Sequence, residues 1–485
     1  MNSTLITIIT VYLFILPVLG ILGHRMARER TLKDYYLAGG TLGTIPLFFT
    51  FYATQYSGNT LLGFAGNAYR NGPVMLFSAL GMMSVVIVFS LIGPRLHHWA
   101  KQLNFVTPGD FILHRFNSRL LLTLVNLVLI ATLASYILTN FKAVGLLVER
   151  ITDGQLPIAY GIMGLAVIMA FYESLGGLRS VVWTDMLQGS LLLVGCIGVA
   201  AAVIYVFGGP ANLLNEVAVN QPQHWQPMDS RQWIRGISIV VLFASAISLY
   251  PHAIQRIYAA QNWPTLKRSF WMMAGMPFVT TLPVILTAMA ATLLLPGLQG
   301  SEADQVIPRL LTYLMNELPA LNLLLALFMA AAIAAIMSTI DSTLLSLGSI
   351  FTHDIIRPVF PAISQARLTR MGKLMSWALM LSMAALALNL PQTIWSLMVI
   401  KLEMLGQILP VMLLGTRWKA VRAMPLICGL IVGCGLSLIL RFGFPEVDLM
   451  GLHAGVVGLA ANFATVGIVH FLRREKPVIV TQAAK

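Results

Sequence analysis

Two short polar clusters in otherwise apolar stretches hold the residues of this sequence that could do chemistry. The first reads Gln-Tyr-Ser-Gly-Asn-Thr over residues 55–60, and the second reads Ser-Thr-Ile-Asp-Ser-Thr over residues 338–343. Both offer amide, hydroxyl or carbonyl oxygens, the ligands that hard cations prefer. The first cluster can also unwind a helix and free its backbone carbonyls. The clusters predict a site for a cation and a polar molecule or, as the alternative, close packing between helices through small residues.

Four ionisable residues also interrupt apolar stretches: Asp185, Asp341, Lys401 and Glu403. A charge at membrane depth is costly, so each is a candidate functional residue. Asp185 begins an apolar run and has an alternative interpretation as a helix N-terminal acid. Lys401 and Glu403 are two residues apart, so they point to different faces of a helix. Lys401 has the alternative of extending to the membrane surface. Glu403, with Gln407 on its own face, could line a pathway.

Composition shows what surrounds these polar groups. Hydrophobic residues make up 58% of the 485 residues and charged residues only 10%, whereas soluble proteins carry about 25% charged residues. This excludes an ordinary soluble domain and predicts a polytopic all-α membrane protein. The three cysteines, Cys196, Cys428 and Cys434, show no spacing typical of a disulfide framework or a metal site.

About thirteen apolar segments are long enough to cross a membrane as helices. They are residues 4–24, 45–69, 73–93, 119–147, 156–175, 183–207, 234–255, 270–296, 320–348, 371–389, 391–415, 423–440 and 450–472. With the N-terminus outside, most of the 31 Lys and Arg residues fall in cytoplasmic segments, as the positive-inside rule requires. The net charge of +13 is thereby explained by topology, and nucleic-acid binding is not expected.

The two polar clusters are predicted to lie at the same depth. Gln55 lies ten residues from the inner end of the segment 45–69, and Ser338 lies ten residues from the inner end of 320–348. At 1.5 Å per residue both are about 15 Å from the inner face. They can therefore meet near the membrane midplane, where transporters bind their substrates and coupling ions.

Several motifs in this order resemble the sodium:solute symporter family, which includes pantothenate, proline and monocarboxylate permeases. They are Asp34-Tyr-Tyr-Leu-Ala-Gly-Gly40, Ala53-Thr-Gln-Tyr-Ser-Gly58, Gly176-Gly-Leu-Arg-Ser180 with Trp183-Thr-Asp185, Tyr250-Pro-His-Ala-Ile-Gln-Arg256 and Ala334-Ala-Ile-Met-Ser-Thr339. The resemblance covers approximately residues 30–415 and implies two inverted five-helix repeats, each beginning with a broken helix. The expected organisation is an N-terminal helix and cytoplasmic loop in 1–44, repeats in 45–207 and 234–415, an outer loop in 208–233, and two C-terminal helices with a tail in 416–485.

The resemblance also implies roles for individual residues. A main sodium site would use the carbonyls of Ala53, Tyr56 and Ala335 and the hydroxyls of Ser338 and Thr339. A second sodium site or release path would involve Asp185, Asp341 and Ser342. The solute would contact Gln55, Ser57, Asn59, Phe243, Ile247 and Gln407. No cofactor beyond the coupling sodium ion is implied.

The sequence departs from the family pattern at several positions. Gln55 and Asn59 stand where the proline permease has an aspartate and a tryptophan, so proline is not the expected solute. Glu173 replaces a small residue of the family consensus. Lys401 could bind a substrate carboxylate, pair with Glu403 through a neighbouring helix, or stand in for a coupling ion.

These features predict sodium-coupled uptake of a small polar solute, a carboxylate or an amino-acid-like molecule, by alternating access. The alternatives are proton-coupled or ion-independent transport, and a membrane sensor acting through a partner. Catalysis is not expected, because no spacing of a nucleophile and a base is visible. The expected location is a bacterial inner membrane, and the sequence leaves the solute and the oligomeric state open.

Overall fold

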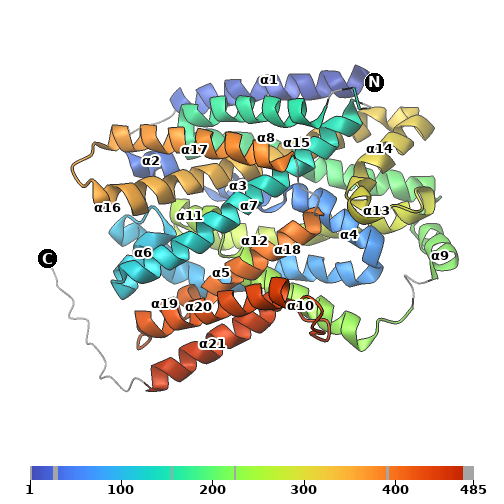
Figure 1. Ribbon diagram of the computed structural model, residues 1–485. Helices are drawn as coiled ribbons and strands as arrows, with labels where there is room; N and C mark the ends of the chain where they lie inside the picture. The colour runs from blue at the N-terminus through green and yellow to red at the C-terminus, as the bar shows by residue number, and fades with distance from the viewer. Residues whose placement is uncertain are drawn as a thin grey trace.

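The computed structural model describes residues 3–25, 31–152, 154–155, 157–222, 226–388 and 393–472. Every regular element within these residues is a helix, and the extended chain there pairs only at an isolated bridge between Leu42 and Ala260 (Figure 1). The all-α prediction is confirmed.

The α-helices run in chain order across the whole described sequence. They are α1 (Ser3–Arg25), α2 (Leu32–Leu37), α3 (Thr44–Gln55), α4 (Phe64–Asn71), α5 (Leu76–Leu103), α6 (Pro108–Phe116), α7 (Arg119–Ile151), α8 (Ile158–Val206), α9 (Pro210–Asn220), α10 (Ser230–Ile247), α11 (Pro251–Ala259), α12 (Trp263–Val279), α13 (Thr281–Leu294), α14 (Val306–Glu317), α15 (Asn322–Ser349), α16 (Arg357–Val359), α17 (Gln365–Ala387), α18 (Ile394–Leu405), α19 (Leu409–Arg417), α20 (Ala423–Leu438) and α21 (Ala454–Leu472). Shorter 3₁₀ or π turns include η2 (Asn59–Gly63), η5 (Gly300–Gln305), η7 (Ile350–Ile356), η8 (Gly406–Ile408) and η9 (Ile439–Gly443).

The number of uninterrupted helices that could cross a membrane, counted over the described residues, differs from the number predicted. Among the described residues, eight helical stretches are long and apolar enough to cross a membrane, or nine if the bent pair α10–α11 counts as one span. The predicted total of thirteen therefore stays a prediction. One reason for the difference is that the predicted span 45–69 is divided into the short helices α3 and α4.

Helix α15 lies at the centre of the bundle and carries the second polar cluster. In its most apolar stretch 83% of the residues are buried, against 28% in α21. α15 packs closely against α8, α7 and α1, while α20 and α21 pack on each other at the far side from α1 (Figure 1). Small residues at Ala331, Ala334 and Ala335 allow this close approach.

Two of the family-like motifs meet on one side of the bundle. The Arg179 guanidinium donates hydrogen bonds to Asp34 Oδ1 from Nη2 at 2.7 Å and from Nε at 3.2 Å. Gly177 interrupts α8 with a φ of +58°, a conformation that favours glycine. A Cβ at this position would also collide with the carbonyl oxygen of Tyr35. The sharp bend in α8 thus depends on a glycine that the neighbouring motif packs against.

Other elements differ from the sequence-based expectation. The predicted span 270–296 is bent at Thr280 between α12 and α13, where Pro277 and Pro283 limit regular hydrogen bonding. The predicted outer loop 208–233 contains the amphipathic helix α9. Helix α14 has no counterpart among the predicted spans, because its twelve residues are too short to cross a membrane.

Candidate cation and solute site

The first polar cluster forms a break between α3 and α4. Tyr56 leaves the helix with φ −100° and ψ 107°, and the chain resumes a helical course in the π turn η2. The Gly58 N–H donates to Asn140 Oδ1 of α7 at 3.2 Å. A Cβ on Gly58 would lie 2.7 Å from the Ala143 Cβ and 2.9 Å from Ile336 Cγ1. Close packing against α7 and α15 therefore holds the break in place.

A second break faces the first. Helix α10 ends at Ile247, α11 begins at Pro251, and the two axes differ by 55°. Pro251 is tolerated because the first helical position needs no N–H donor. Ile247 and Tyr250, on either side of this break, line a cavity that Gln55 of α3 also lines. The two broken helices therefore meet across one cavity.

Helix α15 contacts α3 through the hydroxyls that the sequence marks for sodium. Thr339 Oγ1 donates to the Thr54 carbonyl at 3.3 Å and to the Ala335 carbonyl at 3.0 Å. Ser338 Oγ donates to Asp185 Oδ1 of α8 at 2.5 Å. These residues are fully buried, as are the other expected ligands Ala53 and Tyr56. This all-oxygen donor set, at the end of a broken helix, fits a hard monovalent cation.

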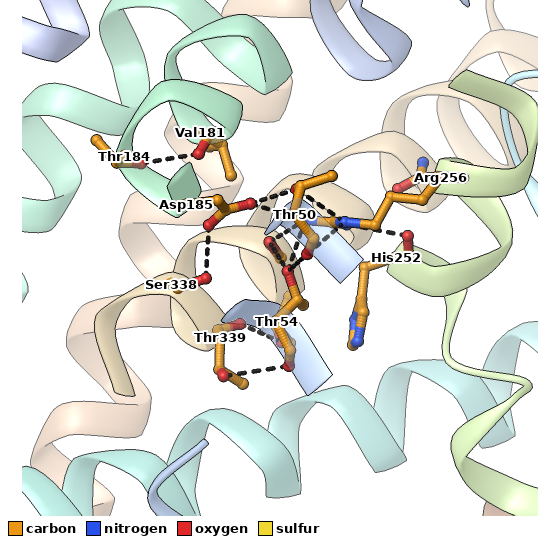
Figure 2. Close-up of polar contacts among 12 residues, drawn as sticks. Thr50, Thr54, Val181, Thr184, Asp185, His252, Arg256, Ser338 and Thr339 are labelled. Atoms are coloured by element: carbon orange, nitrogen blue, oxygen red, sulfur yellow. Dashed lines mark hydrogen bonds and ion pairs between the residues drawn. The ribbon is translucent and has the colours of Figure 1, made fainter. Parts of the chain in front are cut away.

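Asp185 and Arg256 form the centre of a polar network next to this site (Figure 2). Arg256 Nη2 lies 3.3 Å from Asp185 Oδ2, and Thr50 Oγ1 also donates to that carboxylate oxygen. The guanidinium further donates to Thr54 Oγ1 at 2.8 Å and to Ser342 Oγ at 2.6 Å. Asp185 and Ser342, two of the residues considered for a second sodium, therefore both contact Arg256.

Arg256 was not among the expected site residues, because it follows the predicted span 234–255. Its side chain is nevertheless almost completely buried. The signal for its role was its place at the end of the Tyr250–Arg256 motif. Asp341, the remaining residue of the predicted second site, lies one helical turn from Ser338 and is fully buried.

The expected solute-binding residues fall into two groups. Gln55, Ser57, Asn59 and Ile247 line the small cavity between the broken helices. The other residues around it are Thr60, Phe64, Met82, Tyr136, Tyr250, Met398, Lys401 and Leu402. Tyr136 and Tyr250 stack with ring centroids 4.9 Å apart. Tyr250 begins one of the family-like motifs, whereas no feature of the sequence distinguished Tyr136 from an ordinary core aromatic.

Phe243 and Gln407 lie outside this cavity. Phe243 packs behind it, with its ring 5.5 Å from that of Phe64. Gln407 Nε2 faces the C-terminal helices and donates to the Gly455 carbonyl at 2.9 Å. Asn462 Nδ2 in turn donates to the Gln407 carbonyl at 2.9 Å. The packing of α20 and α21 turns Gln407 away from the cavity, an arrangement that the spacing of residues in α18 could not predict.

Lys401 and Glu403 point to different faces, as their spacing predicts. Lys401 lines the cavity, whereas Glu403 Oε1 lies 3.9 Å from both Arg441 and His453. Arg441 is therefore the permanently charged neighbour of this carboxylate. The side chain of Glu173 lies outside the described residues.

A separate polar contact, at Asp304 of η5, ties α4 to α18. The Asp304 carboxylate accepts a hydrogen bond from the Ile394 N–H at 2.8 Å and lies 3.6 Å from Arg70. Burial raises the pKa of Asp304, and the bond from Ile394 and the charge of Arg70 oppose this increase. Polar contacts thus join separate helices at Asp304 as well as in the Asp185–Arg256 network.

Comparison with known proteins identifies this arrangement. The sodium:solute symporter family matches the chain over residues 35–433. The chain belongs to this family. The sodium/pantothenate symporter of Haemophilus influenzae is 26% identical over 88% of this chain and 90% of its own length. A sodium/proline symporter of Staphylococcus aureus is 26% identical over 71% of this chain and 67% of its own length. The resemblance inferred from the motifs is confirmed.

A solved structure shares the fold of this symporter. It is the substrate-bound, outward-open state of a Na⁺-coupled sialic acid symporter, with a TM-score of 0.81, 18% identity, and coverage of 97% of this chain and 98% of that chain. The expected fold class with inverted repeats is confirmed, while the repeat boundaries at 45–207 and 234–415 stay predictions. This symporter is an integral membrane transporter, not an enzyme, and sodium is its coupling ion.

Proposed function

We propose that this symporter takes up a small polar organic solute together with sodium, by alternating access, in the cytoplasmic membrane of a bacterium. The solute would bind against the unwound chain at Gln55, Ser57 and Asn59, facing Ile247. Sodium would bind to the carbonyls of Ala53, Tyr56 and Ala335 and to the hydroxyls of Ser338 and Thr339.

One observation carries this proposal: Thr339 of α15 bonds to the carbonyl of Thr54, the residue next to Gln55 in α3. The end of α3 therefore belongs to both the cation site and the solute cavity. A cation that bridges α3 and α15 would fix the end of α3 and order the solute cavity. Sodium and solute would then favour each other's binding by thermodynamic linkage.

Alternating access requires the polar contacts on the two sides to form and break in turn. On the inner side, Arg256 of α11 holds Asp185 of α8 and Ser342 of α15. On the outer side, Asp304 holds Ile394 and faces Arg70. We infer that opening toward the cytoplasm separates Arg256 from Asp185. The buried oxygens of Asp185, Asp341 and Ser342 would then form the sodium release path.

Sodium titration of thermal stability in the purified protein tests the cation site directly. Sodium should raise the melting temperature in the wild type, with potassium at equal ionic strength as the control. Thr339→Ala should shift this response to higher sodium concentrations. A response that is equal for sodium and potassium would contradict the proposed site and direct attention to protons and the buried acids.

A further inference from the structure

Lys401 is a buried cation that the sodium site and the helix packing leave without a counter-charge. The side chain is 2% exposed, and its Nζ donates to no hydrogen-bond acceptor within the described part of the chain. Its nearest favourable contact is the face of Tyr136, with Nζ 3.2 Å from the ring centroid. A cation–π contact offsets only part of the free energy needed to bury an ammonium group. Burial favours the neutral amine, so an anionic partner in the cavity would be needed to stabilise the ammonium form of Lys401.

The surroundings of Lys401 suggest what it binds. It lines the same cavity as Gln55, Ser57 and Asn59, and no Asp or Glu is among the described residues around that cavity. The Asn59 side-chain oxygen also lacks a hydrogen-bond partner within the residues that the structure describes. A buried cation and a buried amide thus face one space without partners, and buried polar groups in proteins are normally satisfied. A ligand with an anionic group and a hydrogen-bond donor would give partners to the Lys401 Nζ and the Asn59 side-chain oxygen.

The contacts of Lys401 argue against three alternative roles. The ammonium does not reach the membrane surface, because it lies over Tyr136 in the interior. Glu403 does not neutralise it, since that carboxylate faces Arg441. Substitution for the sodium ion would require contact with the hydroxyls of α15, but Ser338 donates to Asp185 and Thr339 to Thr54.

A neighbouring cation does not compete for the same ligand. Arg256 lines the adjoining small cavity, but its guanidinium is engaged with Asp185, Thr54 and Ser342. Among the described residues that line the solute cavity, Lys401 is consequently the basic side chain that can bind an anionic ligand.

We infer that Lys401 selects the solute as an organic anion, with a carboxylate on the ammonium and a hydroxyl or amide group facing Asn59. This inference rests on the proposed function and narrows its solute class. A zwitterionic amino acid fits the cavity less well, because no acidic side chain of the described residues lines it to receive a solute ammonium group. An ion pair shielded from water would also let Lys401 pass between the outward and inward states without an unpaired charge.

Paired ligands that differ only in charge test this inference on the full-length purified protein. Pantothenate is compared with pantothenol and lactate with lactamide, and proline represents the zwitterions. Dissociation constants come from thermal stabilisation in sodium buffer. We expect at least one carboxylate to bind at least about tenfold more tightly than its neutral counterpart, and Lys401→Met to abolish the difference.

Three variants separate recognition from folding. Lys401→Met removes a buried unpaired charge, so its melting temperature without solute should equal or exceed that of the wild type, and sodium should still stabilise it. Lys401→Arg should keep the preference for carboxylates. Lys142→Met, a matched control, removes a lysine of α7 that does not line the cavity and should leave the preference unchanged.

The outcomes distinguish this inference from the proposed function. If no carboxylate binds better than its neutral counterpart, or if Lys401→Met keeps the preference, the inference is overturned. Sodium-dependent binding of a neutral or zwitterionic solute would overturn it while leaving sodium-coupled uptake in place. Loss of the sodium response in the wild type would instead contradict the proposed cation site, whatever the solute preference.

Discussion

Arg256 of α11 and Asp185 of α8 form an ion pair at 3.3 Å, and both side chains are almost completely removed from solvent. The pair joins a helix that follows one chain break to the helix that packs against the other broken helix. Thr50 and Ser338 bind the carboxylate as well, so neither charge is left unsatisfied. The ion pair and the two hydroxyls that bind its carboxylate therefore form one buried polar network.

Removing the acid of this pair should destabilise the protein strongly. Asp185→Asn leaves the Arg256 guanidinium buried without a counter-charge, which costs about 3–5 kcal/mol in comparable cases. We expect a clear fall in melting temperature in detergent. The double variant Asp185→Asn/Arg256→Met should recover part of it, because no unpaired charge remains.

An exposed ion pair in the same protein supplies the control. Arg231 and Asp448 are 2.7 Å apart, but their side chains are 70% and 54% exposed. Exposed pairs contribute at most about 1 kcal/mol, so Asp448→Asn should change the melting temperature little. If Asp185→Asn lowers the melting temperature as little as Asp448→Asn does, the buried ion pair does not stabilise the protein as described.

The hydroxyls of α15 should affect sodium and solute together. Ser338→Ala and Thr339→Ala each remove one oxygen from the proposed cation site, and about tenfold weaker sodium binding corresponds to about 1.4 kcal/mol. Because the two ligands are linked, solute affinity at subsaturating sodium should fall as well. Sodium dependence of uptake in proteoliposomes measures both effects.

Thr343→Ala is the matched control on the same helix. The Thr343 hydroxyl donates to the Thr339 carbonyl, one turn away, at 2.7 Å. Its loss should leave the sodium dependence unchanged. Equal effects of Thr343→Ala and Thr339→Ala would mean that the hydroxyls act through the stability of α15 rather than as ligands.

The sequence predicted local features of the site better than its side-chain partners. The break after Gln55 and the hydroxyl stripe at Ser338 and Thr339 are set by nearby residues, and both appear in the structure. The reach of Arg256 to Thr54 joins residues 202 positions apart in the chain. Such contacts depend on how α11 packs, which no local pattern encodes.

The bend in α8 should depend on glycine at position 177. Gly177→Ala places a Cβ against the carbonyl of Tyr35 and forces alanine to a φ of +58°, so we expect a loss of about 2 kcal/mol or more in stability. Gly164→Ala, in the same helix, meets no atom within 4 Å and should be neutral or slightly stabilising. Thermal unfolding of both variants makes the comparison. Equal melting temperatures would show that the bend does not require glycine.

Gln55 and Gln407 should behave differently, although the sequence placed both at the solute. Gln55 lines the cavity, so Gln55→Ala should raise the KM for uptake by about tenfold, the effect of about 1.4 kcal/mol, with little change in melting temperature. The Gln407 side chain instead donates to the Gly455 carbonyl at 2.9 Å and accepts a hydrogen bond from Asn462 Nδ2 at 3.3 Å. Gln407→Ala leaves buried polar groups unsatisfied, which costs about 1–3 kcal/mol. It should therefore lower the melting temperature and the amount of folded protein while the KM stays unchanged. A raised KM in Gln407→Ala, with normal stability, would instead place this glutamine in contact with the solute during part of the transport cycle.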